Sequence, residues 1–272
     1  MTDAMVYTGE NWDERAREYQ RVFSLGLNNY NAALLRFWHE EGMLRPGYRV
    51  LDIGCGVGKY GTYLAELGYE VTLTDLSEEM LRHASENMSG YQTPWTVYQC
   101  DFREATGKEP VFADGFDLAI STMSPAVCDV ETVRKMSNMT HGWCFLARFQ
   151  SWEQPVRDDL IRRMGFKPSR TTENHAADVD AMIQAVRAAG YEPFIRFVPY
   201  NWSDERSPAE MAETLCRHYY EETDRERIYD AALTAAKEYA GRDGQINDAV
   251  NTEVAWIYWK TPDLQKTEPR LL

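Results

Sequence analysis

The chain has 272 residues, of which 43 are acidic and 29 are Lys or Arg, so its formal net charge is −14. This length is sufficient for one large domain, or for a domain that carries an insertion. The charge argues against a nucleic-acid-binding protein, because no surplus of basic side chains is present to displace the counterions of a phosphate backbone.

The first residues do not form a basic flank followed by an apolar run, and no stretch approaches the roughly 18 apolar residues of a membrane span. We therefore expect a cytoplasmic protein with no membrane partner. The five cysteines include no C-x-x-C pair. This favours neither a disulfide framework nor a zinc ribbon, and we expect no metal site.

The amino-terminal segment predicts helices. Residues 12–43 read as two amphipathic helices, and Pro46 and Gly47 end the helical pattern. We expect residues 1–46 to form a helical cap over the domain that follows, residues 47–272.

From Gly47 to Gln150, short apolar runs alternate with amphipathic stretches. The apolar runs are "YRVLDI", "YEVTLTD", "TPWTVYQC", "FDLAIST" and "GWCFLARFQ". Parallel strands need crossover connections, which are usually helices. The alternation therefore predicts an α/β fold with a mainly parallel sheet and helices on both faces.

The remaining chain predicts further elements of the same sheet and an insertion. A helix over residues 176–189 ends at Gly190, and "YEPFIRFVPYNW" and "NTEVAWIYWK" read as strands. Between these strands, residues 201–249 look helical.

One helix of this insertion has a clear start signal. Ser207 can cap it, Pro208 occupies the first helical position and Glu210 completes a capping box. The insertion is either a solvated lobe or a docking element for a partner.

The stretch "VLDIGCGVGKYG", residues 50–61, contains two overlapping glycine patterns. Gly54, Gly56 and Gly58 form G-x-G-x-G. The glycines at 56, 58 and 61 form the G-x-G-x-x-G that is associated with dinucleotides. One loop cannot use both patterns in the same way.

Asp52 favours the first pattern. A dinucleotide fold needs its first glycine directly after the strand, so a start at Gly56 would extend the strand through Asp52 and Gly54. If the strand instead ends near Ile53, Asp52 lies at its carboxyl edge, where ligands of open α/β sheets bind. A carboxylate there would repel a pyrophosphate and suit a ligand with positive centres. Gly61 is then a helix-packing glycine.

This stretch closely resembles the first motif of the class I S-adenosylmethionine-dependent methyltransferases, in which a strand ending in an acidic residue runs into a G-x-G-x-G loop. The likeness covers roughly residues 47–150. It implies a Rossmann-like sheet of seven strands and S-adenosylmethionine as cofactor. The resemblance places the cofactor beside Asp52, which favours its ammonium group, and against the loop of Gly54, Cys55, Gly56 and Gly58.

A second match lies at the end of "VTLTD". By the resemblance, Asp75 accepts hydrogen bonds from both ribose hydroxyls, and Leu76 and Met80 lie beside the ribose and the adenine. The alternatives are that Asp75 merely caps the helix near Ser77 and that Met80 is a core residue.

A third match is "YQCDFREA". In the family an acidic residue here, Asp101, takes the adenine amine, and its neighbour Phe102 packs on the ring. Taken alone, an Asp after a strand is usually a helix cap.

The fourth match is "FDLAISTMSPAV". Asp117 resembles a structural acidic residue of the family, and Ser121 to Pro125 would line the floor beside the transferable methyl. Many enzymes that methylate amino groups of nucleic acids or glutamine carry an Asn or Asp followed by two prolines here. The "STMSPA" of this chain departs from that pattern, which argues against those substrates.

Methyl transfer by in-line displacement requires mainly binding and orientation, so no catalytic triad is expected. If a general base is used, His39 in the cap and His218 in the insertion are the better candidates among the histidines. Tyr19 ends the stretch "WDERAREY", which resembles the amino-terminal lid of the family. Tyr19 is therefore either a contact of the cofactor or substrate, or an ordinary helix-packing residue.

The function expected from these matches is methyl transfer to a small molecule. The alternatives are a protein methyltransferase, an NAD-linked oxidoreductase that uses Gly56, Gly58 and Gly61, and a cofactor-binding protein without catalysis. The sequence leaves open the accepting atom, which could be N, O, S or C, and the oligomeric state.

Overall fold

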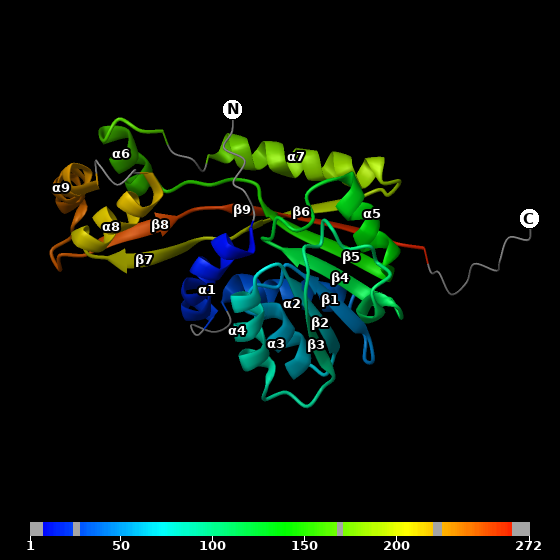
Figure 1. Ribbon diagram of the computed structural model, residues 1–272. Helices are drawn as coiled ribbons and strands as arrows, with labels where there is room; N and C mark the ends of the chain where they lie inside the picture. Colours follow the sequence, from blue (N-terminus) through cyan, green and yellow to red (C-terminus); the bar gives the residue numbers. More distant parts are fainter. Residues whose placement is uncertain (1–7, 24–27, 168–170, 220–224, 263–272) are drawn as a thin grey trace, which may run out of the picture. The chain divides into compact units, whose positions relative to one another are not determined.

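The computed structural model describes residues 8–23, 28–167, 171–219 and 225–262. The chain divides into two compact units (Figure 1). Unit 1 comprises Met1–Arg148, Asp180–Arg196 and Ala255–Leu272, and unit 2 comprises Phe149–Val179 and Phe197–Val254.

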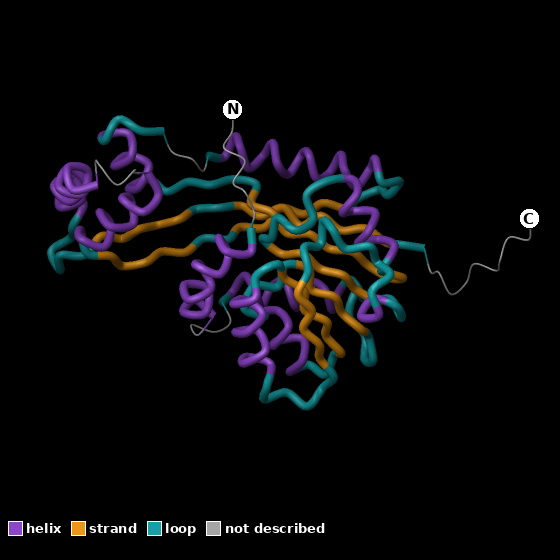
Figure 2. The backbone as a smooth tube through the Cα atoms, viewed as in Figure 1, coloured by secondary structure: helices purple, strands orange, loops and turns teal. Residues whose placement is uncertain are grey.

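Unit 1 is built on a sheet with helices around it (Figure 2). The sheet has seven strands in the order β3-β2-β1-β4-β5-β9-β6. The strands are β1 (Arg49–Ile53), β2 (Glu70–Asp75), β3 (Trp95–Gln99), β4 (Phe116–Thr122), β5 (Thr140–Phe149), β6 (Phe194–Pro199) and β9 (Glu253–Lys260). The pairs from β3 through β5 are parallel. The Thr261 N–H donates to the Gly142 carbonyl at 2.9 Å, so the end of β9 lies beside the start of β5 and β9 runs in the opposite direction. The expected, mostly parallel sheet is confirmed.

Helices cover both faces of this sheet. The helices with residues in unit 1 are α1 (Gly9–Phe23), α2 (Asn29–Glu40), α3 (Lys59–Glu66), α4 (Glu78–Met88), η1 (Pro110–Phe112), α5 (Val130–Asn138) and α7 (Thr172–Ala188). Phe37 of α2 packs on Trp256, with 4.7 Å between the ring centroids, whereas Ser137 of α5 accepts a hydrogen bond from Trp259 at 3.0 Å. Trp256 and Trp259 are three residues apart on one strand, so they point to opposite faces.

The amino-terminal helix α1 packs against α4. Ala16 of α1 forms a buried cluster with Val57 and Met80, and Trp12 and Phe23 pack on its edge. Because Val57 belongs to the glycine-rich stretch and Met80 to α4, the first helix is fixed next to the predicted cofactor loop.

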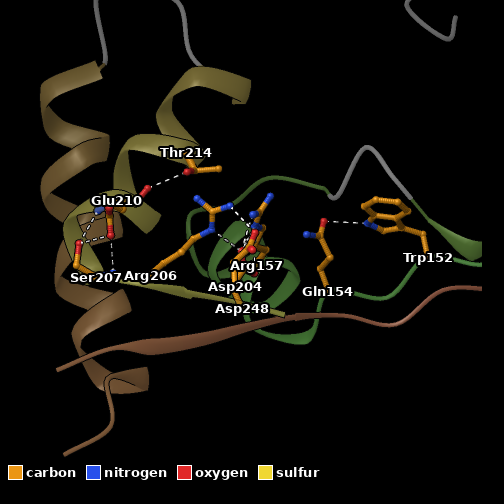
Figure 3. A network of polar contacts seen from close by, with 9 residues as sticks. All are labelled: Trp152, Gln154, Arg157, Asp204, Arg206, Ser207, Glu210, Thr214 and Asp248. Atoms are coloured by element: carbon orange, nitrogen blue, oxygen red, sulfur yellow. Dashed lines mark hydrogen bonds and ion pairs between the residues drawn. The ribbon is translucent and has the colours of Figure 1, made fainter. Parts of the chain in front are cut away.

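Unit 2 contains a two-stranded antiparallel sheet with helices packed against it. Its elements are α6 (Pro155–Arg163), β7 (Trp202–Arg206), α8 (Pro208–Tyr219), α9 (Arg225–Ala236), η2 (Lys237–Tyr239) and β8 (Ile246–Val250). The predicted capping box at the start of α8 is confirmed (Figure 3). The Ser207 hydroxyl accepts from the Glu210 N–H at 3.2 Å, and the Glu210 carboxylate accepts from the Ser207 N–H at 2.8 Å.

The insertion differs from the expected helical segment at its two ends. Its central helices α8 and α9 are present, but residues 202–206 and 246–250 are strands. The strand signal was hidden because residues on one face of the strand pair are charged, namely Asp204, Arg206 and Asp248. A period-two pattern is visible in a sequence only when the buried face is apolar.

Helix α6 was not predicted. Apart from α6 and the two strands at the ends of the insertion, the helices and strands follow the predicted order. No helix in the described ranges is long and apolar enough to cross a membrane.

Candidate functional site

The glycine loop leaves β1 in conformations that side chains rarely adopt. Gly54 has φ +70°, and its N–H donates to the Thr74 carbonyl at 2.8 Å. A Cβ atom at Gly54 would lie 1.8 Å from the Ser124 hydroxyl oxygen. The loop after β4 is therefore packed directly on the glycine loop, and only glycine fits at this contact.

The other glycines follow the first of the two patterns. β1 ends at Ile53, so Gly54 is the glycine directly after the strand. Gly58 has φ +79° and precedes α3, and a Cβ there would lie 3.1 Å from the Ala84 Cβ. Inside α3, a Cβ at Gly61 would lie 2.6 Å from a methyl carbon of Leu73. Gly61 thus serves helix packing, as the sequence predicted.

Asp52 is buried at the end of β1, with 1% of its surface exposed. Neither carboxylate oxygen has a hydrogen-bond partner among the described residues. Burial raises the Asp52 pKa to about 8, and the nearby Asp75 contributes to the increase. An unpaired buried carboxylate is costly to keep ionised, and a bound cation would remove this cost.

Cys55 is held in the same turn. Its N–H donates to the Thr74 carbonyl at 2.9 Å, and its thiol lies 3.4 Å from the Gly56 carbonyl. Burial and the neighbouring Asp75 and Asp52 raise the Cys55 pKa well above its usual value. The thiol is therefore protonated at neutral pH and is a poor nucleophile.

Asp75 connects the glycine loop to the start of α4. Its carboxylate accepts from the Gly56 N–H at 2.9 Å and from the Ser77 N–H at 3.0 Å. Burial raises the Asp75 pKa, and these backbone hydrogen bonds oppose the increase. Ser77, not Asp75, is the N-cap, because its hydroxyl accepts from the Met80 N–H at 3.0 Å. Each Asp75 oxygen keeps a lone pair that a ribose hydroxyl could use.

Leu76 and Met80 line the region between α1 and the glycine loop. Leu76 is half-buried, and a Cβ at Gly9 would lie 3.4 Å from its carbonyl oxygen. Met80 is buried, and its sulfur is 3.9 Å from the Cβ position of Gly56. The packing of Met80 in the core is shown, and its contact with an adenine stays a prediction.

Asp101 already has a partner. Its carboxylate forms an ion pair with Arg103 at 2.5 Å, and the hydrogen bonds from Arg103 hold its pKa below the usual value. An adenine amine would have to share this carboxylate. Phe102 beside it is buried.

Ser121 lies near the end of β4, which is adjacent to β1. Asp52 is in register with Ile120, so the next residue, Ser121, points to the opposite face of the sheet from Asp52. The Ser121 hydroxyl is buried and has no hydrogen-bond partner within the described ranges.

The loop after β4 contains residues that the sequence analysis did not single out. The Arg148 guanidinium donates to three main-chain carbonyls, those of Ser121, Val127 and Ala147, at 3.1, 2.7 and 2.8 Å. Met123 in this loop has φ +52°. An arginine near the end of an otherwise apolar strand was the available signal for Arg148, whereas no sequence pattern indicates a strained methionine.

The remaining sequence candidates are His39, Tyr19, His218 and Asp117. His39 is exposed in the last turn of α2, which leads into the start of β1. Tyr19 is 45% exposed on α1 and contacts Trp12 edge to face, with 6.4 Å between the ring centroids. The side chain of His218 lies outside the described residues. Asp117 has a structural role, because it accepts a hydrogen bond from the Arg49 N–H at 2.8 Å.

The described residues contain no group of three or more His, Cys, Asp or Glu side chains that could hold a metal ion.

Comparisons with known proteins identify the same region. The sequence profile of the family "Methyltransferase domain" matches residues 50–142. YqeM of Bacillus subtilis (strain 168), a candidate methyltransferase by its name, is 45% identical over 75 residues, which cover 28% of this chain and 30% of YqeM. Phosphoethanolamine N-methyltransferase 3 of Arabidopsis thaliana is 27% identical over 190 residues, which cover 65% of this chain and 36% of that protein. The chain thus spans only about a third of these curated relatives.

A solved structure shares the fold. The Haemonchus contortus phosphoethanolamine N-methyltransferase 2, in complex with phosphomonomethylethanolamine and S-adenosylhomocysteine, aligns with a TM-score of 0.51 and 19% identity, covering 96% of this chain and 59% of the other. This likeness shows a shared fold. Residues 50–142 of this chain match a methyltransferase domain, and the sheet that contains them has the fold of a solved methyltransferase.

Proposed function

We propose that the protein transfers the methyl group of S-adenosylmethionine to a small-molecule acceptor by in-line displacement. The observation that carries this proposal is the buried Asp52, whose two oxygens have no partner in the described part of the chain. It lies directly before a loop in which Gly54 can carry no side chain.

The residues present fit this cofactor. Asp52 would accept the ammonium of its methionine part, and in doing so a buried charge would gain the counter-charge that it lacks. The N–H groups in the first turn of α3, which directly follows the glycine loop, would meet the carboxylate. Asp75 would accept the ribose hydroxyls with the lone pairs that Gly56 and Ser77 leave unused.

When bound, S-adenosylmethionine supplies an electrophilic methyl group on a sulfonium. The chain has to hold the accepting atom about 3 Å from that methyl and in line with the departing sulfur. The loop after β4, which packs on Gly54 through Ser124, is the element that we assign to this positioning. Binding, orientation and exclusion of water are the chain's main tasks in this reaction class, and the accepting atom decides whether a general base is also needed.

A small-molecule acceptor is supported by two features. The acidic chain is unsuited to a polyanionic substrate. Among the relatives, the Arabidopsis thaliana protein and the glycine N-methyltransferase of Rattus norvegicus, 32% identical over 96 residues, are named for small molecules. A cytoplasmic location is part of the same proposal.

Isothermal titration calorimetry with S-adenosylhomocysteine tests the cofactor, with NADH as the matched control. We expect S-adenosylhomocysteine to bind and NADH not to bind. Binding of NADH alone would favour the alternative, an NAD-linked oxidoreductase.

A screen for release of S-adenosylhomocysteine then tests the reaction, using primary amines, thiols, phenols and carboxylic acids as acceptors. In parallel, methyl-labelled cofactor is incubated with a cell lysate. A labelled protein band without any small-molecule turnover would favour a protein methyltransferase instead.

A further inference from the structure

The loop that joins β4 to α5 contains a strained backbone position. Met123 has φ +52° and is the one residue other than glycine with a positive φ in the described ranges. Glycine would adopt this conformation without strain, whereas the Cβ atom of any other residue makes it sterically unfavourable. A side chain at such a position therefore points to a function of that side chain.

The surrounding structure holds Met123 in this conformation. Its N–H donates to the Ala147 carbonyl at 3.0 Å. The Arg148 guanidinium binds the carbonyl of Ser121 before the strained residue and that of Val127 after it. One side chain thus fixes both ends of the loop.

The loop also lies next to the predicted cofactor site. β4 pairs with β1, so the carboxyl ends of the two strands are adjacent. Ser124, the residue after Met123, packs on Gly54 so closely that no Cβ fits between them. The Met123 side chain itself is half-buried, which leaves part of its surface able to contact a ligand.

We propose that Met123 selects the methyl acceptor, with its side chain forming a wall against which an apolar part of the acceptor packs. Arg148 is the positioning residue that holds Met123 there. This inference rests on the proposed methyl transfer. The flexible and polarizable thioether suits an apolar group that lies against the accepting atom.

Three substitutions separate the side chain from the backbone strain. Met123→Ala removes the side chain and keeps the strain, Met123→Gly removes both, and Met123→Leu keeps the apolar volume and the strain. For each variant we would measure the melting temperature, the affinity for S-adenosylhomocysteine, and kcat and KM with the best acceptor of the amine, thiol, phenol and carboxylic acid panel.

We expect kcat/KM to fall at least about tenfold in the Ala and Gly variants, mainly through a higher KM, and to change less than about threefold in the Leu variant. The affinity for S-adenosylhomocysteine should stay within about threefold throughout. The Gly variant should melt no lower than the Ala variant, because the strain is gone.

The proposal is overturned if the Ala and Gly variants keep kcat/KM within about threefold, or if cofactor affinity falls in parallel with kcat/KM. No turnover by the unmodified chain with any acceptor of the panel would instead overturn the proposed function itself, and this inference with it.

Arg148→Lys tests the positioning role. This variant keeps the charge and loses the planar fork that reaches several carbonyls. We expect a similar loss in kcat/KM, and a combined Arg148→Lys and Met123→Ala variant that loses no more than the worse single variant, because both act on one contact. Additive losses would show that Arg148 does not act through Met123.

Discussion

Each of the two units buries an aspartate almost completely, and the two carboxylates have opposite surroundings. Asp52 in unit 1 and Asp248 in unit 2 are both 1% exposed. Asp52 has no hydrogen-bond partner among the described residues, whereas Asp248 accepts from Arg157 and Arg206 at 2.5–3.1 Å (Figure 3).

The difference distinguishes a carboxylate that is paired within the fold from one for which we propose a ligand. Asp248 is paired within the fold, because α6 contributes Arg157 and β7 contributes Arg206. It needs no ligand, and it ties a helix to a strand. Asp52 has no comparable partner among the residues that the structure describes, and the proposed cofactor would supply one. Equal burial therefore has opposite meanings, and the contacts of each carboxylate decide which applies.

The largest expected effect comes from breaking the paired aspartate. Asp248→Ala leaves two arginines, each about one-fifth exposed, without their buried counter-charge. We expect a loss of about 3–5 kcal/mol in the free energy of unfolding, measured by urea denaturation. The control is Asp204→Ala, because this half-exposed carboxylate binds the same Arg206. It should cost less than about 1 kcal/mol. Equal losses would contradict the structural role of Asp248.

Substitution in the glycine loop should nearly abolish cofactor binding. Gly54→Ala combines a positive φ with a Cβ 1.8 Å from the Ser124 hydroxyl. We expect the affinity for S-adenosylhomocysteine to fall at least about 100-fold in calorimetry. Gly47→Ala is the matched control, since Gly47 has φ +85° but no atom within 4 Å of its Cβ position. Unchanged affinity in the Gly54 variant would exclude this loop as the cofactor site.

Neutralising Asp52 should weaken cofactor binding without lowering the free energy of unfolding. Asp52→Asn removes the partner of the ammonium, so we expect a loss of about 10- to 100-fold in affinity for S-adenosylhomocysteine. The free energy of unfolding should not fall at neutral pH, because the ionised form of Asp52 is unfavourable in the free protein. A variant that binds normally would refute the assigned role.

The smallest expected effect is the release of a proton when the ligand binds. The folded pKa of Asp52, about 8, is raised above the ordinary value of 3.8, so at pH 6.5 the free protein carries a protonated Asp52. Binding of an ammonium should ionise it and release up to about one proton, measured by calorimetry in buffers of different ionisation enthalpy.

The same pKa sets the pH dependence of stability. Between pH 4 and 8 the folded state holds a proton that the unfolded state has lost, so Asp52 makes stability fall as the pH rises. Asp52→Asn should remove this slope and the proton release together. Loss of only one of them would show that another group titrates.

Much of unit 1 could be predicted because its signals are local. The strands are short apolar runs that alternate with amphipathic stretches. The G-x-G-x-G reading followed from the position of Asp52, and the position of Gly61 against Leu73 agrees with it. Each of these depends on residues that are close together in the sequence.

The remainder depends on loop conformations and on contacts between distant residues. The ion pair of Asp101 with Arg103 depends on a loop conformation that no periodicity encodes. The three carbonyls around Arg148 come from two strands and a loop. The charges on one face of β7 and β8 are explained by the pairing of Asp248 with Arg157 and Arg206, which are 91 and 42 residues away in the sequence.

The guanidinium of Arg148 also limits how this loop can evolve. It binds the Ser121 and Val127 carbonyls at once, so the distance between them is fixed by the width of a single planar group. Insertions or deletions between these two residues would break one contact or the other. We therefore expect related proteins that keep this arginine to diversify their acceptors by exchanging side chains within a loop of constant length.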